Sequence, residues 1–444
     1  MKKPAVALCN AGFAADARSA ASGRGMPGLR VVPETVPSGS PWIAAMEEVE
    51  AGVSAAIDDI VAALTQPLTP EEEFPVAKAA ERPSRIVFAG DLREVNRFFY
   101  RRGWGDGLPI IPPTEEAVAE MLKGTDLPPD HVVAKIIPRF GKATVEKIAV
   151  NAVMAGALPT YMPVLIAGIQ AALDPRTRFN TIEVSTGSWS PFWILNGPVR
   201  RDLHVNSGSG ALSPGDIANA TIGRAMGLII KNIGGVRKGV EDMGVFGNPG
   251  KYTMVIAENE EESPWEPLHV QQGFKKEDCT VSVFFPNTFS HIPMYASDDR
   301  GIMNTVISNI LPGRRGLFCL LLNPGRAKTL ASSGWTKKDI AGFISEYARV
   351  PAHRHSHYRP TKETQRAALW QRPPHHPQDS MAILNSPDWI RVVVAGGPSG
   401  NLGLVQGGSA ERGNEWVTKK VELPADWDKL VEKYSNLVPR YVQY

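Results

Sequence analysis

The pattern of hydrophobic and polar residues over the first 65 positions predicts a small α/β unit. Residues 5–9 and 29–32 are short continuous apolar runs, which are typical of buried strands. Residues 13–21 are rich in alanine and predict a helix between these strands. Residues 43–64 carry apolar side chains at helical spacing and predict a second helix. Strands separated by a helix in so short a segment indicate a parallel pair.

The next segment predicts a linker, and a larger region follows it. Residues 66–85 are rich in proline and charge, so we place the domains at 1–68 and 86–444, with a linker at 69–85. Ser213 and Pro214 predict the N-cap and first residue of a helix that ends near Asn232. We expect further strands at 86–90, 252–257, 280–285, 316–322 and 390–395, and further helices at 92–102, 144–154, 162–173, 299–310 and 336–348.

These elements predict an α/β fold in which a small parallel α/β half-domain is linked to a larger mixed α/β (α+β) domain. The chain of 444 residues has 43% hydrophobic and 21% charged residues, enough for a sizeable core. The formal net charge of +2 gives no reason to expect nucleic acid as a partner. No apolar run approaches the roughly 20 residues that span a bilayer, so we expect no membrane association. Three cysteines far apart in sequence favour a reducing, cytoplasmic location.

An acidic loop after the predicted strand 252–257 is a candidate for acid–base chemistry. Glu260, Glu262 and His269 lie in a segment that is stiffened by two prolines and a tryptophan. Carboxylates held close together raise one another's pKa and can serve as acid and base. A solvated acidic surface is the alternative interpretation.

A loop of small residues before the predicted Ser213 helix is a candidate anion site. Free backbone N–H groups and the helix dipole favour negative charge at such a position. Two arginines upstream add positive charge, and an earlier glycine-rich turn allows close approach of a ligand. A purely structural role for both loops is equally compatible with the pattern. The candidate substrate-binding residues are Asp106, Arg200, Arg201, Asn206, Ser207 and Gly208.

A histidine cluster is a candidate metal site. His353, His355 and His357 alternate, so in a strand their imidazoles would share one face. His375 and His376 follow after a proline-rich stretch. The spacing matches no specific zinc motif, and an exposed basic surface explains it equally well. A divalent metal is therefore an alternative cofactor, which metal analysis of the purified chain would detect.

Cys9 ends the first predicted strand, immediately before the first helix. This position exposes catalytic groups in α/β units, and a helix N-terminus lowers the pKa of a thiol. Cys9 is therefore a candidate catalytic residue, with a buried structural cysteine as the alternative.

Residues 1–68 resemble a known family. The strand at 5–9, Phe13, the Gly-Met-Pro-Gly-Leu segment at 25–29, the loop ending at Pro41 and the helix closing at 62–65 carry the resemblance. They are similar to the C-terminal half of the UGSC-like domain, which is named for a selenocysteine- or cysteine-Gly-Ser-Cys motif. The remainder resembles the large region that accompanies such domains in bacterial proteins.

The Cys-Gly-Ser-Cys motif does not occur in this chain. The resemblance therefore implies a companion small subunit that carries the motif and completes the half-domain. It implies an oligomeric enzyme doing thiol- or selenol-based redox or lyase chemistry on a small anionic organic or sulfur compound. A non-catalytic scaffold or binding subunit is a second hypothesis. A metal-dependent hydrolase or hydratase using the cluster from His353 to His376 is a third.

Overall fold

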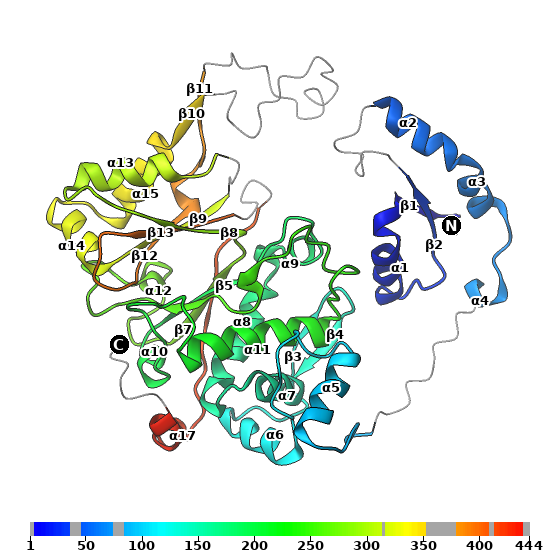
Figure 1. The fold of residues 1–444 in the computed structure, drawn as a ribbon, viewed down its shortest axis with the longest axis horizontal. Helices are drawn as coiled ribbons and strands as arrows, with labels where there is room; N and C mark the ends of the chain where they lie inside the picture. The colour runs from blue at the N-terminus through cyan, green and yellow to red at the C-terminus, as the bar shows by residue number, and fades with distance from the viewer. Residues whose placement is uncertain are drawn as a thin grey trace.

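The structure is a computed structural model of the chain, and its helices and strands form an α/β fold, as the hydrophobic pattern predicts (Figure 1). In the described part of the chain, no helix is long and apolar enough to cross a membrane. The described residues are 4–35, 46–73, 84–312, 316–351, 379–407 and 413–437.

A small region at the start of the chain contains a two-stranded parallel sheet. β1 (Val6–Asn10) pairs in parallel with β2 (Arg30–Glu34), and α1 (Ala14–Gly23) connects the two strands. This confirms the predicted order of strand, helix and parallel strand. α1 and α3 (Ile57–Thr65) each contact both strands and lie on opposite sides of the sheet (Figure 1).

The helix predicted at 43–64 is divided in two. α2 (Met46–Ala55) ends before Ala56, and α3 begins directly after it. The backbone N–H of Ala56 donates to the carbonyl of Val53, three residues back, so the helical ladder tightens and breaks there. A short α4 (Pro70–Glu73) follows, and Glu72 in it forms an ion pair with Arg30 of β2 at 2.7 Å.

One buried carboxylate joins the small region to the rest of the chain. The side chain of Glu241 is fully buried and accepts hydrogen bonds from Ser19 of α1 at 2.7 Å and from Arg139 at 3.1 Å. Arg237 donates a further bond at 2.6 Å. Burial alone would raise the pKa of Glu241, but these hydrogen bonds outweigh it and lower that pKa to about 2. Glu241 is therefore a charged contact between the two regions.

The larger region contains two mixed four-stranded sheets. In the first, the strand order is β14-β7-β5-β6, and β5 and β6 are parallel. In the second, the order is β12-β9-β13-β8, and β9 and β12 are parallel. The strands of these sheets are β5 (Phe192–Asn196), β6 (Val255–Ala257), β7 (Thr280–Phe284), β8 (Thr288–Ile292), β9 (Leu317–Leu322), β12 (Ile390–Val394), β13 (Leu402–Gly407) and β14 (Val417–Lys420). Two further pairs of strands are antiparallel. β3 (Val132–Ile136) pairs with β4 (Gly141–Thr144), and β10 (Arg349–Pro351) pairs with β11 (Ser380–Ala382).

The two sheets pack face to face, with helices on both outer sides. Along β5, Phe192 and Ile194 belong to the core between the sheets, whereas Trp193 and Leu195 belong to the outer core. β9 alternates in the same way between the inner core and a second outer core. Because successive side chains of a strand point to opposite faces, this alternation defines four layers, ordered helix, sheet, sheet, helix.

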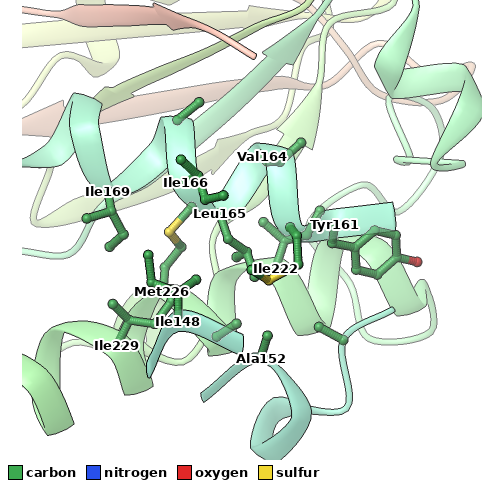
Figure 2. Packing of buried hydrophobic residues seen from close by; sticks show 14 of the residues in the cluster. Ile148, Ala152, Tyr161, Val164, Leu165, Ile166, Ile169, Ile222, Met226 and Ile229 are labelled. Carbon is green, nitrogen blue, oxygen red and sulfur yellow. The ribbon is translucent and has the colours of Figure 1, made fainter. Parts of the chain in front are cut away.

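α8 and α11 cover the first sheet and α7 packs against these two helices, whereas α13, α14 and α15 cover the second sheet (Figure 1). Figure 2 shows how Leu165 and Ile169 of α8 meet Ile148 of α7 and Met226 of α11. These side chains are fully buried, and each such burial stabilises the fold by about 1.5–3 kcal/mol. The helices of the larger region are α5 (Leu92–Arg101), α6 (Glu115–Met121), α7 (Val145–Ala155), α8 (Met162–Ala172), α9 (Phe179–Ile182), α10 (Val199–Asp202), α11 (Ile217–Gly234), α12 (Leu268–Gln271), α13 (Asp299–Asn309), α14 (Pro324–Ser332), α15 (Lys337–Tyr347) and α17 (Trp427–Tyr434).

Two predictions for this region are wrong. The strand expected at 86–90 is not regular structure, because no strand in the described ranges pairs with it and Phe88 instead stacks on Phe98 with ring centroids 4.6 Å apart. The helix expected to begin at Ser213 and Pro214 begins later, after Asp216 as its N-cap. Short polar segments with proline favour a turn as well as a helix start, and here the turn continues for three more residues.

Candidate functional site

The carboxyl ends of the parallel strands in both sheets lie together. The N–H of Asn259, after β6, donates to the carbonyl of Val394 at the end of β12 at 2.8 Å. The N–H of Gly396, after β12, donates to the carbonyl of Ser207 at 2.8 Å. The loops after β5, β6 and β12 therefore meet at one end of the paired sheets. Ligands of α/β proteins bind at such ends, so we sought the site there.

The centre of this end is the buried carboxylate of Glu258, the first residue after β6. It is fully buried and accepts hydrogen bonds from Asn196 at 2.7 Å and from the backbone N–H of Leu268 at 2.6 Å. It also forms an ion pair with Lys337 at 2.9 Å, whose side chain is 5% exposed. Lys337 is the first residue of α15, on the far side of the second sheet. This ion pair therefore joins the two halves of the larger region.

Glu260 lies two residues further on and is held through one oxygen. Its Oε1 accepts hydrogen bonds from Asn196 at 3.0 Å and from the backbone N–H of Gly197 at 2.7 Å, and lies 3.1 Å from Nε of Arg200. No hydrogen bond or ion pair among the described residues uses Oε2. The carboxylate is thus fixed at one oxygen, and the other is available to accept a proton.

A glycine is required beside Asn196. Gly197 has φ of +82°, and an added Cβ would lie 2.1 Å from the carbonyl oxygen of Asp278. Only glycine adopts this conformation and tolerates this approach without strain. The close turn directs the backbone N–H of Gly197 to Glu260.

Arg200 is buried beneath its acidic partners. Its guanidinium donates to both oxygens of Glu261, at 2.8 and 2.7 Å, and its side chain is only 6% exposed. Burial alone would lower the pKa of Arg200, but the hydrogen bond to Glu261 and the charges of both carboxylates raise it. The same hydrogen bond lowers the pKa of Glu261. Arg200 is therefore a fixed cation whose planar fork holds a carboxylate.

These side chains line a pocket of about 480 Å³, which we call the Arg200 pocket. The lining contains three cationic and three carboxylate side chains, so its net charge is zero. An added anion can therefore bind only if one of the carboxylates is displaced. Glu261 is 50% exposed and is the carboxylate nearest to solvent on the Arg200 fork. The lining residues are Gly197, Pro198, Arg200, Arg201, Glu260, Glu261, Lys276 and Glu277.

The other two candidates from the acidic loop lie outside this lining. Glu262 is 52% exposed and contacts Asn259 and Lys328. His269 is fully buried behind the pocket wall, with Nε2 3.4 Å from the carbonyl of Lys276. Its Nδ1 is buried and has no hydrogen-bond partner among the described residues.

The small-residue loop predicted to bind an anion is closed on itself. The side chain of Asn206 accepts from the N–H of Gly208 at 2.7 Å and donates to Asp216 at 2.8 Å. The carbonyl of Ser207 accepts from Gly396, as described above. Asn206, Ser207 and Gly208 therefore hold the loop against the start of α11 and the end of β12.

Asp106 and Cys9 lie apart from the Arg200 pocket. Asp106 forms a two-bond ion pair with Arg224, at 2.7 and 3.0 Å, in the middle of α11. Cys9 is in β1 of the small region, and burial raises the pKa of its thiol. The nearby charge of Arg18 acts in the opposite direction, and the role of Cys9 stays a prediction from the sequence.

The metal candidates His353, His355 and His357 lie outside the described residues. Within the described part of the chain, no group of three or more His, Cys, Asp or Glu side chains could hold a metal ion. The histidine cluster therefore stays a prediction from the sequence alone.

Sequence reasoning missed Asn196, Glu258 and Lys337. The signal for Asn196 was present, because residues 192–195 are a continuous apolar run that is followed by Asn-Gly-Pro. Glu258 and Lys337 are far apart in sequence, and nothing local to either residue indicates their pairing.

Comparisons with protein-family models, with curated proteins and with solved structures find no match to this chain.

The two carboxylates on Arg200 are expected to differ in their effect on stability. Glu260→Gln removes a nearly buried charge beside a buried arginine, and should lower the free energy of unfolding by about 2–3 kcal/mol. Glu261→Gln removes a half-exposed partner that water screens, and should lower it by less than about 1 kcal/mol. Urea unfolding at pH 7 measures both. Glu277→Gln, in the same pocket without a bond to Arg200, is the matched control, and a larger loss for Glu261→Gln than for Glu260→Gln would contradict this geometry.

Proposed function

We propose that this chain is the substrate-binding subunit of an enzyme that acts on a small anionic organic or sulfur compound in the Arg200 pocket. The observation that carries the proposal is a buried arginine fork, at the carboxyl ends of parallel strands, that already holds a carboxylate. A substrate carboxylate would make the same two-bond contact after it displaces Glu261.

Positive charge at the mouth of the pocket supports an anionic substrate. The side chain of Arg201 is 65% exposed and its nearest carboxylate oxygen, on Glu261, is 3.7 Å away. Lys276 is also exposed on the pocket wall. Displacement of Glu261 would leave Arg200 and Arg201 facing the incoming anion together. The pocket would then have an excess of positive charge.

Glu260 is the proposed proton acceptor. Two hydrogen bonds and an ion-pair contact with Arg200 fix its Oε1 and so orient Oε2, the geometry that a general base needs. Asn196 acts as a positioning residue in this proposal, because it touches the base and does not line the pocket. His269 and Glu262 have no part in it, since neither lines the pocket.

The thiol or selenol nucleophile is proposed to come from a companion subunit. Two strands are too few for a stable sheet, and among the described residues β1 pairs only with β2. The backbone groups on the other edge of β1 therefore have no partner strand in the described part of the chain, and Leu8 on its face is 43% exposed. A companion chain that adds strands beside β1 would cover this edge, as the resemblance to the UGSC-like domain implies.

A non-catalytic binding subunit is the second candidate. Glu241, which holds the small region, follows the carboxyl end of α11, whereas Asn206 of the pocket end contacts the start of that helix. α11 has 18 residues, so these two ends lie about 27 Å apart. In this arrangement a thiol at the end of β1 does not reach the Arg200 pocket of the same chain.

Binding of a charged probe tests the pocket. Mercaptoacetate carries a carboxylate and a thiol, whereas 2-mercaptoethanol has the same size and no charge. We expect calorimetric titration to show millimolar binding of mercaptoacetate and none of 2-mercaptoethanol, with Arg201→Gln weakening the former about tenfold. Arg24→Gln, an exposed arginine of the small region, is the control. Equal binding of both probes, or binding that Arg201→Gln leaves unchanged, would remove the pocket from the proposal.

Co-expression tests the companion. Because the β1 edge is uncovered, the chain expressed alone should be mostly insoluble. Co-expression with a small protein that carries Cys-Gly-Ser-Cys, encoded beside it, should raise the soluble fraction several-fold and yield a complex on gel filtration. A fully soluble chain that binds no such protein would refute this part of the proposal.

A further inference from the structure

α5 forms one wall of an exposed groove of about 740 Å³. Leu92 and Tyr100, two turns apart on this helix, are 63% and 71% exposed, and Leu108 on the opposite wall is 49% exposed. Large apolar side chains gathered in one hollow indicate a surface that binds another molecule.

A row of arginines runs beside these apolar residues. Arg93, Arg97 and Arg101 line the groove at intervals of four residues, so they share one face of α5 over about 12 Å. All three are exposed, and among the described residues none of them forms an ion pair. Asp91 also lines the groove, so three cations face one carboxylate. The groove therefore combines an apolar strip with a predominantly positive strip, which fits an amphipathic segment with acidic residues.

The chain contains a surface of that chemistry. Residues 46–73, which include α2 and α3, carry eight acidic residues and no basic residue. On α3, Ile57 and Val61 are 49% and 50% exposed, and Asp58 and Asp59 beside them are exposed as well. This face thus offers apolar and acidic positions at helical spacing, the complement of the α5 groove.

α3 cannot occupy the α5 groove of its own chain in this arrangement. α1 is held to the larger region by the bond from Ser19 to Glu241. α3 lies on the opposite side of the β1–β2 sheet from α1, so its exposed face points away from the larger region (Figure 1). The complementary face that reaches this groove must come from another molecule.

We propose that α3 of one copy of the chain docks in the α5 groove of a second copy. A two-fold dimer makes this contact twice, because each copy contributes one groove and one acidic helix. Ile57 and Val61 pack between Leu92 and Tyr100, and Asp58 faces the arginine row. The free edge of β1 stays open for the companion subunit, since α3 covers a face of the sheet and not its edge.

Charge reversal tests the contact. The soluble chain, alone or with its companion, is examined by sedimentation velocity at about 50 mM salt, where surface charges are weakly screened. We expect a two-fold assembly of the wild type. Arg97→Glu and Asp58→Arg should each raise its dissociation constant at least about tenfold, because each places like charges at both contacts. Circular dichroism verifies that both variants remain folded.

Mixing the two variants gives the decisive result. In the mixed pair, one contact has the native charges and the other has both charges reversed, so each contact is attractive again. The mixture should therefore recover the wild-type assembly, whereas Lys338→Glu, at an exposed position of α15, should leave the wild-type assembly unchanged. A wild type without two-fold assembly, single variants that assemble like the wild type, or a mixture that does not recover would each overturn the proposal.

Discussion

The larger region depends on a buried charge that must be neutralised. Glu258 ends β6 inside the protein, where an unpaired carboxylate would be very costly. Its three partners come from β5, from the start of α12 and from the first turn of α15. Hydrophobic packing between the sheets supplies most of the stabilisation but is not directional. The ion pair of Glu258 with Lys337 fixes which strand ends meet, because the contact between the two charges is lost if one sheet shifts by a few ångströms relative to the other.

The order imposed at Glu258 extends into the pocket. The amide of Asn196 donates to Glu258 and also to Glu260, and Glu260 in turn contacts Arg200. Glu261 ends the chain of contacts at the surface. These contacts run from the buried pair of Glu258 and Lys337 to solvent, so the position of the arginine fork depends on that pair. The small region is joined to the larger one by the hydrogen bond from Ser19 to Glu241 and by the close approach of Gly23 to Pro138. Its two-stranded sheet has free edges, which favours partners for it.

Local pattern predicted most of the elements but little of the site. Amphipathic and apolar runs indicated the α/β class, whereas residues 86–90 have the composition of a strand and no partner strand. Residues 192–196 were overlooked although they are the centre of a sheet. Arg200 was predicted as a site residue because its charged side chain lies close in sequence to a glycine-containing loop. Glu258 and Lys337 could not be paired from sequence, since only the stacking of two sheets brings them within 2.9 Å.

A double-mutant cycle on this ion pair tests the account most directly. Glu258→Gln and Lys337→Met each leave one buried charge without its partner, and each should lower the free energy of unfolding by about 3–5 kcal/mol. The double variant leaves neither charge, so it should be more stable than either single variant. Urea unfolding at pH 7 measures all four corners of the cycle. Losses that simply add would show that Glu258 and Lys337 act independently and would contradict the central role given to their pairing.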